Sequence, residues 1–294
     1  MLGVWGTRRV PQFFPFPRLA PIFPGMDERR GRLTREGIRI HEAADFAGMR
    51  AAGRVAGAIL DAVGPLVVPG ATTGALDAAI TAMVADAGAV SATVGYKDYE
   101  HASCISVNHV VCHGIPGDKV LKDGDVLNVD VTVIVDGWYG DTSRMFVAGT
   151  PSRKAARLVR VTHDATMRGI EAARPGNTFG DVGHAIQAYV EGQGMSVVRD
   201  FCGHGLGRVF HAPPNVLHYG RPGTGPRLEE GMFFTVEPMV NLGRPETKVL
   251  ADGWTAVTRD KSWSAQFEHS IGVTSGAPEV FTASPAGVFY PPGV

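Results

Sequence analysis

The stretch Pro69–Gly88, PGATTGALDAAITAMVADAG, decides the fold, because it returns 106 residues later as PGNTFGDVGHAIQAYVEGQG at Pro175–Gly194. Nine of the twenty positions are identical in the two copies. Each copy breaks the chain at a Pro-Gly pair, offers a Thr as a helix N-cap, and continues with apolar residues at helical spacing. The repeat indicates an internal duplication, with related halves at about 40–150 and 151–285.

A longer helix is expected before each copy of the repeat. Apolar residues recur at helical spacing over Phe46–Val63, and a Gly-Pro pair ends that pattern. In the second half, Ser152 opens a helix that runs to about Ala173. Each half therefore begins with a pair of helices.

Strands are expected after each helix pair. Val126–Val135 is rich in Val and Ile, and the Asp136-Gly137 pair that follows is a strong signal for a two-residue hairpin turn, with Trp138–Val147 as the return strand. Further strands are expected at Gly231–Val240, Lys248–Leu250, Trp254–Thr258 and Gln266–Thr274. We expect an α+β fold in which two α/β halves share one central sheet, with a cleft between them.

Composition excludes several classes of protein. The chain has 294 residues, of which 38 are Gly and 20 are Pro, but 44% are hydrophobic. That apolar fraction argues against a disordered chain, and the Gly triplet of a collagen is absent. A net charge of −1 makes DNA or another nucleic acid an unexpected main partner. No apolar run reaches the ~18–20 residues of a membrane helix, so no membrane partner is expected.

The cysteines and the N-terminal arginines bear on the compartment. Cys104, Cys112 and Cys202 are too few, and odd in number, for a disulfide scaffold, which favours the reducing cytoplasm. Arg8-Arg9 matches a twin-arginine export signal, but the prolines within residues 10–24 would spoil the apolar helix that such a signal needs.

Residues 1–39 form a Pro- and Arg-rich extension that we expect to be irregular, ahead of a single domain over residues 40–294. Met26 offers an alternative start of translation. Residues 1–40 hold eight Arg against three acidic residues, a local net charge of +5.

Two aspartates of the expected hairpin are candidates for chemistry. With a two-residue turn, Asp130 faces Ser143, and Asp141 lies two positions from that partner. Both carboxylates then lie on one face of the hairpin as diagonal neighbours. Asp130 interrupts an apolar strand, where a buried carboxylate needs a cation or a full set of hydrogen-bond donors. A chance pair of aspartates without function remains open at this point.

The second half adds a histidine and two glutamates. His204 lies in a Gly-rich stretch that allows close approach of backbone. Glu237 and Glu268 interrupt apolar strands in the way that Asp130 does. If these residues converge with the aspartates, four carboxylates cannot be buried without divalent cations. Oxygen ligands with one imidazole suit Mn, Fe, Co or Zn, and five ligands indicate two ions.

Seven segments of the chain carry a resemblance to a known family. They are Ile105–Pro116 (ISVNHVVCHGIP), Leu127–Val131 (LNVDV), Gly140–Phe146 (GDTSRMF), Cys202–Gly207 (CGHGLG), Thr235–Val240 (TVEPMV), Asp252–Thr255 (DGWT) and Ser264–Ile271 (SAQFEHSI). They occur in the order that type I methionine aminopeptidases have them, and the chain resembles that family over about residues 40–282. The resemblance implies a cytoplasmic metallopeptidase of the pita-bread (creatinase/aminopeptidase) fold, with two pseudo-twofold-related halves around a central antiparallel sheet. It further implies removal of the N-terminal methionine from nascent chains, with preference for a small second residue.

The resemblance also implies a role for each candidate residue. Five residues would ligate two divalent metal ions, Asp130, Asp141, His204, Glu237 and Glu268. Glu237 would also move the proton of the attacking water, His211 would stabilise the oxyanion, and His113 would bind the scissile amide nitrogen. The methionine pocket would be lined by Tyr96, Tyr99, Cys104, Phe210 and Trp254, with His113 and His211 beside it. A monovalent cation site would involve Asn108, Val110 and Ser264.

The chain departs from the family's usual sequence at a few positions. Ala212 and Pro213 follow His211 where the family usually has two glutamates, so the rim of the cleft loses two negative charges. Thr93 and His109 stand where a Cys and a Glu are common. None of these positions is among the five expected ligands.

The sequence disfavours three alternative classes of protein. A cysteine hydrolase is suggested by adjacent Cys112 and His113, but neighbouring residues of a strand point to opposite faces. A non-catalytic binding protein of the same fold would be expected to lose metal ligands. A prolidase-like aminopeptidase would usually carry a larger N-terminal domain. The basic residues 1–40 add the hypothesis that the chain docks on ribosomal RNA.

Overall fold

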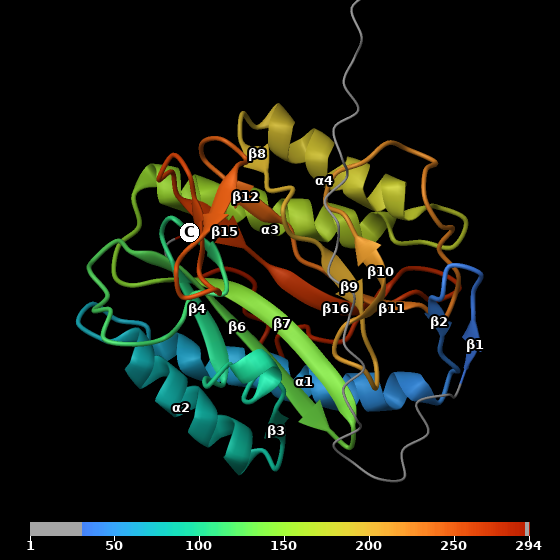
Figure 1. Cartoon of the computed structure of the whole chain (residues 1–294), viewed down its shortest axis with the longest axis horizontal. Helices are drawn as coiled ribbons and strands as arrows, with labels where there is room; N and C mark the ends of the chain where they lie inside the picture. The colour runs from blue at the N-terminus through green and yellow to red at the C-terminus, as the bar shows by residue number, and fades with distance from the viewer. Residues whose placement is uncertain (1–30, 292–293) are drawn as a thin grey trace, which may run out of the picture.

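The computed structural model describes residues 31–291 and Val294. Four helices flank the strands, two from each half of the chain: α1 (Asp45–Val63), α2 (Thr73–Asp86), α3 (Arg153–Ala172) and α4 (Phe179–Gly192). In Figure 1 the pair α1–α2 lies below the central strands and the pair α3–α4 lies above them. Short 3-10 helices occupy Gly64–Leu66 and Tyr96–Asp98. The helices expected from both copies of the repeat are present.

One large antiparallel sheet joins the two halves. Its order is β10-β9-β11-β16-β7-β6-β3, with β4 also paired to β6 and β17 to β16. The bounds are β3 (Val90–Ser91), β4 (Ser103–Val107), β6 (Val126–Val135), β7 (Trp138–Val147), β9 (Gly203–Gly205), β10 (Ala212–Val216), β11 (Phe233–Val236), β16 (Glu268–Gly272) and β17 (Glu279–Val280). The halves meet where β7 pairs with β16, and the expected central sheet is confirmed.

Three small sheets complete the described structure. Strands β15 (Ser264–Gln266), β12 (Met239–Asn241) and β8 (Ser196–Val197) form one of them. Strands β13 (Thr247–Val249), β14 (Ala256–Thr258) and β5 (Val110–Cys112) form another. The third consists of β1 (Arg32–Leu33) and β2 (Arg39–Ile40).

Regular structure begins before the expected boundary at residue 40. Strands β1 and β2 pair with each other. Ile38, which lies between them in the sequence, is 1% exposed because it packs into the apolar cluster that also contains residues of α3 and α4. Residues 31–39 are therefore part of the fold rather than an irregular extension. Arg8-Arg9, Met26 and most of the basic stretch lie outside the described residues.

Threonines cap the repeated helices, as the sequence predicts. The Thr72 side chain accepts a hydrogen bond from the Ala75 N–H at the start of α2. Thr178 caps α4 and forms a full capping box with Asp181. Each side chain satisfies a backbone N–H that the helix itself leaves unpaired.

Two of the expected strands are interrupted. The strand expected over Gly231–Val240 is divided into β11 and β12, which belong to different sheets, because Pro238 has no N–H to donate to a ladder. The strand expected over Gln266–Thr274 is divided in the same way into β15 and β16, at Phe267. Glu237 and Glu268 lie at these two changes of sheet.

Two large apolar clusters form most of the core. One cluster packs α1 and α2 against β4 and β6, and it includes Leu60, Ile80 and Val129. The other packs α3 and α4 against β11 and β16, and it includes Leu158 and Ile186. None of the helices in the described residues combines the length and apolar character needed to cross a bilayer. Each pair of helices therefore packs against the strands that its own half contributes.

Candidate metal centre

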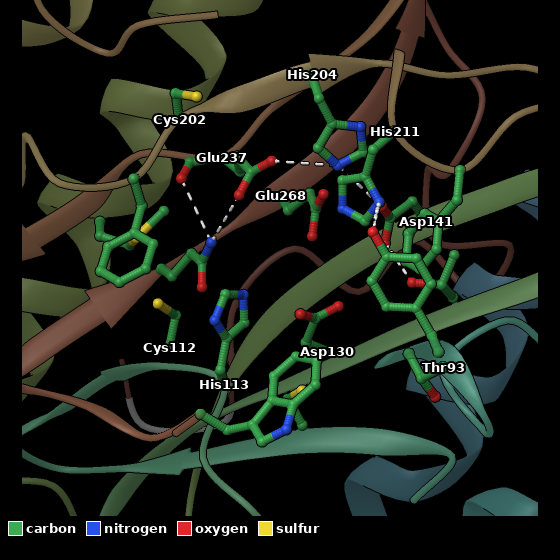
Figure 2. A pocket seen from close by; sticks show the side chains of 18 of the residues that line it. Thr93, Cys112, His113, Asp130, Asp141, Cys202, His204, His211, Glu237 and Glu268 are labelled. Carbon is green, nitrogen blue, oxygen red and sulfur yellow. Dashed lines mark hydrogen bonds and ion pairs between the residues drawn. The ribbon is translucent and has the colours of Figure 1, made fainter. Parts of the chain in front are cut away.

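A cavity of about 300 Å³ lies at the junction of the two halves, and Figure 2 shows the side chains that point into it. All five expected metal ligands line it, and so do the two candidate catalytic histidines and the five residues of the expected methionine pocket. These residues are Asp130, Asp141, His204, Glu237, Glu268, His113, His211, Tyr96, Tyr99, Cys104, Phe210 and Trp254. Segments far apart in the sequence therefore converge on one cavity.

The β6–β7 hairpin supplies the first two carboxylates. Asp130 pairs with Ser143, and Thr132 pairs with Asp141, which is the register expected from a two-residue turn. The Thr132 hydroxyl donates a 2.7 Å hydrogen bond to Asp141 Oδ1 and so fixes that carboxylate. The hairpin alone places both aspartates on one face of the sheet.

His204 reaches the cavity from β9, between two glycines that cannot be replaced without a clash. A Cβ at Gly203 would collide with the Thr235 carbonyl oxygen, and a Cβ at Gly205 would collide with the Pro213 carbonyl oxygen. The Gly-rich stretch is therefore required for close packing of β9 between β10 and β11.

Glu237 and Glu268 reach the cavity from the two points where the chain changes sheet. Glu237 follows the last residue of β11, and Glu268 is the first residue of β16. The Thr142 hydroxyl donates a 2.7 Å hydrogen bond to the backbone oxygen of Glu268, which ties β16 to the hairpin. The same two breaks that interrupt the strands thus position both glutamates.

The ligand atoms lie within the range of a shared cation. One ligand atom each of Asp141, His204 and Glu268 lie within 4.8 Å of one another, and all three side chains are buried. His204 Nε2 is 3.5 Å from Asp141 Oδ2 and 3.8 Å from Glu237 Oε1. In Figure 2 the Asp130 carboxylate points toward the same group.

The carboxylates repel one another in this enclosed space. Burial, followed by the charge of Asp141, raises the pKa of Asp130 and of Glu268 well above the ordinary range. Burial raises the pKa of Glu237 to about 7. Burial alone would lower the pKa of His204, but its hydrogen bond to Asp141 and the charge of Glu237 raise it. Three carboxyl groups with raised pKa values beside an imidazole fit divalent cations. Without a positive charge nearby these groups keep their protons, and a bound cation would take the place of those protons.

Three supporting residues were not identified from the sequence. Thr235 Oγ1 donates to Glu237 Oε1 at 2.7 Å and accepts from the His204 N–H at 3.0 Å, so it links two ligands. Gln266 Nε2 lies 3.3 Å from Glu237 Oε2. The buried His218 accepts the Glu237 N–H at Nε2, at 3.1 Å. Thr235 precedes Glu237 by two strand positions, a signal that could have found it, whereas His218 offers none.

Both candidate catalytic histidines are held in the neutral form. Burial lowers the pKa of His113 to about 4. Burial, followed by the charge of His204, lowers the pKa of His211 well below its usual value. The Tyr96 hydroxyl is 3.1 Å from His211 Nδ1, and the His211 ring lies 4.2 Å from that of His204. A neutral imidazole can donate one hydrogen bond to a reacting group without adding a charge.

Aromatic rings form the wall of the cavity beside the ligands. Tyr99 packs against Trp254 with ring centroids 4.9 Å apart, and Tyr96 packs against Phe210 at 5.1 Å. Cys104 adds a sulfur to this wall. Polarisable rings and sulfur suit a flexible thioether side chain.

The geometry corrects one step of the sequence reasoning about Cys112 and His113. Strand β5 ends at Cys112, and His113 has a φ of 55°, so both residues line the cavity rather than opposite faces. Burial raises the pKa of the Cys112 thiol well above its usual value, while it lowers that of His113. Both pKa shifts favour the neutral thiol and the neutral imidazole, which argues against a thiolate nucleophile.

Asn108 and Ser264 meet outside this cavity. The Ser264 N–H donates a 2.8 Å hydrogen bond to the Asn108 carbonyl oxygen, and Val110 begins the neighbouring β5. The Ser264 hydroxyl is buried with no hydrogen-bond partner among residues 31–291.

Comparison with known proteins agrees with this arrangement. Residues 47–275 match metallopeptidase family M24. The methionine aminopeptidase of Rickettsia prowazekii is 55% identical over 256 residues, which are 87% of this chain and 99% of that protein. The methionine aminopeptidase of Escherichia coli (strain K12) is 51% identical over 201 residues, which are 68% of this chain and 76% of that protein.

Solved structures agree as well. The crystal structure of the Rickettsia prowazekii methionine aminopeptidase has a TM-score of 0.83 and covers 83% of this chain and 99% of that one. The prolidase from Pyrococcus furiosus has a TM-score of 0.65 at 20% identity, and the match covers 83% of this chain but 65% of that one, so it shows only that the fold is shared. The matched sequence and the shared fold together show that the chain belongs to metallopeptidase family M24, among the methionine aminopeptidases.

Proposed function

We propose that this chain hydrolyses the first peptide bond of nascent proteins and peptides that begin with methionine, with preference for a small second residue. The convergence of five ligand-type side chains and an aromatic, sulfur-containing wall on one cavity carries the proposal. Family membership supports the same reaction, since the similar proteins named above are methionine aminopeptidases.

Two divalent cations fit the donor set of Asp130, Asp141, His204, Glu237 and Glu268. Asp141 would join the ligands of the two halves, because it belongs to the hairpin and its Oδ2 lies 3.5 Å from His204 Nε2. Bound there, such ions would polarise the scissile carbonyl and acidify a water molecule. Mn, Fe, Co and Zn all suit four carboxylates with one imidazole.

The protein's own groups would handle the proton and the developing charge. Glu237 reaches into the cavity, so its carboxylate is suited to accept a proton from the attacking water and pass it to the leaving amine. Neutral His211, oriented by the Tyr96 hydroxyl, would donate a hydrogen bond to the carbonyl oxygen as negative charge develops. His113, across the cavity, would bind the scissile amide nitrogen.

The aromatic wall would select the methionine side chain. Tyr96, Tyr99, Phe210 and Trp254 surround the space next to Cys104. Lys97 is exposed at this wall, with its ammonium 5.2 Å from the Tyr96 ring centroid. Ala212 and Pro213 leave the rim without the two acidic side chains usual in the resembling family, which would change preferences beyond the cleaved bond.

Finer aspects of the proposal concern the setting of the enzyme. Three unpaired cysteines support action in the cytoplasm. The unpaired Ser264 hydroxyl beside Asn108 supports a monovalent cation site with Val110. The net charge of +5 over residues 1–40 supports contact with ribosomal RNA, and equal cosedimentation with ribosomes by full-length and truncated protein in low salt would refute that contact.

Release of methionine from Met-Ala and Met-Gly peptides tests the proposal. We expect turnover that disappears with EDTA and returns with Mn, Co, Fe or Zn. Alkylation of thiols should leave turnover largely intact, because the cysteines are poor thiolates. Preferential cleavage of Xaa-Pro dipeptides, with Met-Ala uncleaved, would instead identify a prolidase-like enzyme.

A further inference from the structure

The segment from Thr93 to Ser103 forms one wall of the cavity in an unusual backbone conformation. It carries the lining residues Thr93, Tyr96, Lys97 and Tyr99, and it leads directly into Cys104. Lys97 and Asp98 have φ values of 50° and 64°, in the left-handed region that costs energy for residues other than glycine. Such a segment keeps its shape only where surrounding groups hold it.

Hydrogen bonds within the segment close it into a loop. Thr93 Oγ1 donates to the His101 carbonyl oxygen at 2.7 Å, which joins the two ends. The Tyr99 hydroxyl donates to the Ser103 carbonyl oxygen at 2.9 Å. The shape of the wall therefore depends on where His101 and Ser103 are fixed.

Asp77 of α2 fixes both of these residues. Its Oδ1 accepts hydrogen bonds from the Ser103 N–H at 2.9 Å and from the Ser103 hydroxyl at 2.7 Å. Its Oδ2 is 3.1 Å from His101 Nδ1. Asp77 is 7% exposed, on a helix whose other buried side chains are Thr73 and apolar residues such as Leu76 and Ile80. A carboxylate so placed is costly unless donors meet it, and here three donor positions do.

The clamp that Asp77 forms with His101 and Ser103 lies close to both the pocket wall and the candidate metal ligands. Ser103 begins β4, and the next residue, Cys104, lines the cavity and pairs with Asp130 of β6. The His101 ring also lies edge-on to Tyr99, at 5.6 Å, and Tyr99 in turn packs against Trp254. A shift at His101 or Ser103 would reach the aromatic wall directly.

We propose that Asp77 is a positioning residue which, through His101 and Ser103, sets the shape of the pocket wall and so the selectivity for the methionine side chain. The selectivity part rests on the proposed function. The positioning part concerns the segment alone, so the two can be tested apart.

The experiment compares Asp77→Asn with Asp86→Asn, which makes the same change at an exposed position of the same helix. For Asp77→Asn with metal bound we expect the KM for Met-Ala peptides to rise about tenfold while kcat changes less, since one or two charge-assisted hydrogen bonds are lost. The Kd for free methionine, measured by calorimetry, should rise in parallel, and the preference for methionine over leucine peptides should fall. Asp86→Asn should match wild type.

Hydrogen exchange gives a readout that does not depend on turnover. Amides of residues 95–103 should exchange faster in Asp77→Asn, while those of α4 should not change. Ser103→Ala and His101→Ala each remove one donor, so they serve if Asp77→Asn fails to fold. In the double variants their effects on KM should be less than additive with that of Asp77→Asn.

The possible outcomes separate the two claims. Faster exchange over residues 95–103 with unchanged KM, methionine Kd and selectivity would overturn the proposal, because the clamp would then not shape the pocket. Unchanged exchange in all three folded variants would overturn it as well. If wild type neither cleaves Met-Ala nor binds methionine, the proposed function fails and with it the selectivity role, while the exchange data still decide the positioning role.

Discussion

The two halves of the molecule share one helix unit but place their candidate metal ligands in different ways. The first half supplies Asp130 and Asp141 from a single continuous hairpin, β6–β7. The second half supplies His204 from β9, Glu237 from the residue after β11 and Glu268 from the start of β16, and the two glutamates stand where the chain changes sheet. Local register is enough to place the first pair, whereas the second set needs the packing of the whole half. Duplication of the scaffold therefore did not duplicate the site.

The largest effect is expected at the residue that joins the two ligand sets. Asp141 Oδ2 lies 3.5 Å from Nε2 of His204, a residue of the other half, and Asp141 forms a cluster with His204 and Glu268. Loss of a supporting group around a metal costs roughly 10–100-fold, so loss of this ligand should cost on the order of 1000-fold or more. We predict that Asp141→Ala loses metal, measured by elemental analysis, and essentially all kcat/KM for Met-Ala.

Asp136→Asn is the matched control for that prediction, because it removes an exposed carboxylate from the turn of the same hairpin and Asn tolerates its φ of 48°. It should keep full metal content and activity. Substantial turnover by Asp141→Ala with metal supplied would show that the hairpin is not the common support of the site.

The same contrast explains what could be predicted from the sequence. The hairpin register that places Asp130 opposite Ser143 follows from a two-residue turn and strand alternation. The breaks beside Glu237 and Glu268 were missed, since apolar residues run through both and only Pro238 marks one of them. His218, which accepts the Glu237 N–H, lies outside any periodic pattern and is placed by tertiary packing alone.

The next-largest effect is expected at the two candidate catalytic histidines, one from each half of the chain. His211, on the second-half side, is oriented by Tyr96 and faces His204, whereas His113 lies across the cavity. Removal of an oxyanion donor or a general acid typically costs about 100-fold or more. We predict a fall in kcat of about 100-fold for His211→Ala, and a smaller fall with a larger rise in KM for His113→Ala.

Steady-state kinetics with metal-loaded enzyme checks the contrast between the two histidines. His211→Gln keeps a donor and should recover part of kcat. If both alanine variants change kcat and KM in the same proportion, the two sides of the cavity do not have the separate roles assigned here.

A smaller effect is the pH dependence of metal affinity, which follows from the raised pKa values of the buried carboxylates. The folded, metal-free chain holds Glu237 with a pKa of about 7, against 4.5 ordinarily, because of burial. Its protonated form thus contributes stability below about pH 4.5 that is lost as pH rises toward 7. Metal binding must release such protons, so metal affinity should fall by roughly tenfold for each bound proton as pH drops one unit below 7.

Thermal unfolding with and without Mn between pH 5 and pH 8 measures this linkage. The stabilisation by metal should grow as pH rises across that range. Buried His41, whose pKa burial lowers to about 4, makes the protein less stable as pH falls below 6.5, with or without metal. That slope is common to both forms and cancels in their difference. A stabilisation by Mn that does not change with pH would mean that the ligands are already ionised without metal.

The smallest effect compares the two copies of the repeated helix start directly. Thr72 caps α2 with a single hydrogen bond from the Ala75 N–H at 3.1 Å. Thr178 caps α4 within a box, in which Asp181 Oδ2 accepts both the Thr178 N–H at 2.8 Å and the Thr178 hydroxyl at 2.7 Å. Loss of a cap costs about 0.5–2 kcal/mol, so we predict that Thr72→Ala lies near the lower end of that range and Thr178→Ala near the upper end.

Urea unfolding of the metal-loaded protein measures both costs, and serine at either position should restore most of the loss because it keeps the capping oxygen. The difference should shrink when Asp181→Asn is added, because the box then loses the carboxylate that accepts from Thr178. Equal costs for the two alanine variants would mean that the second half gains nothing from the box. The capping box would then have no part in stabilising the half that supplies His204, Glu237 and Glu268.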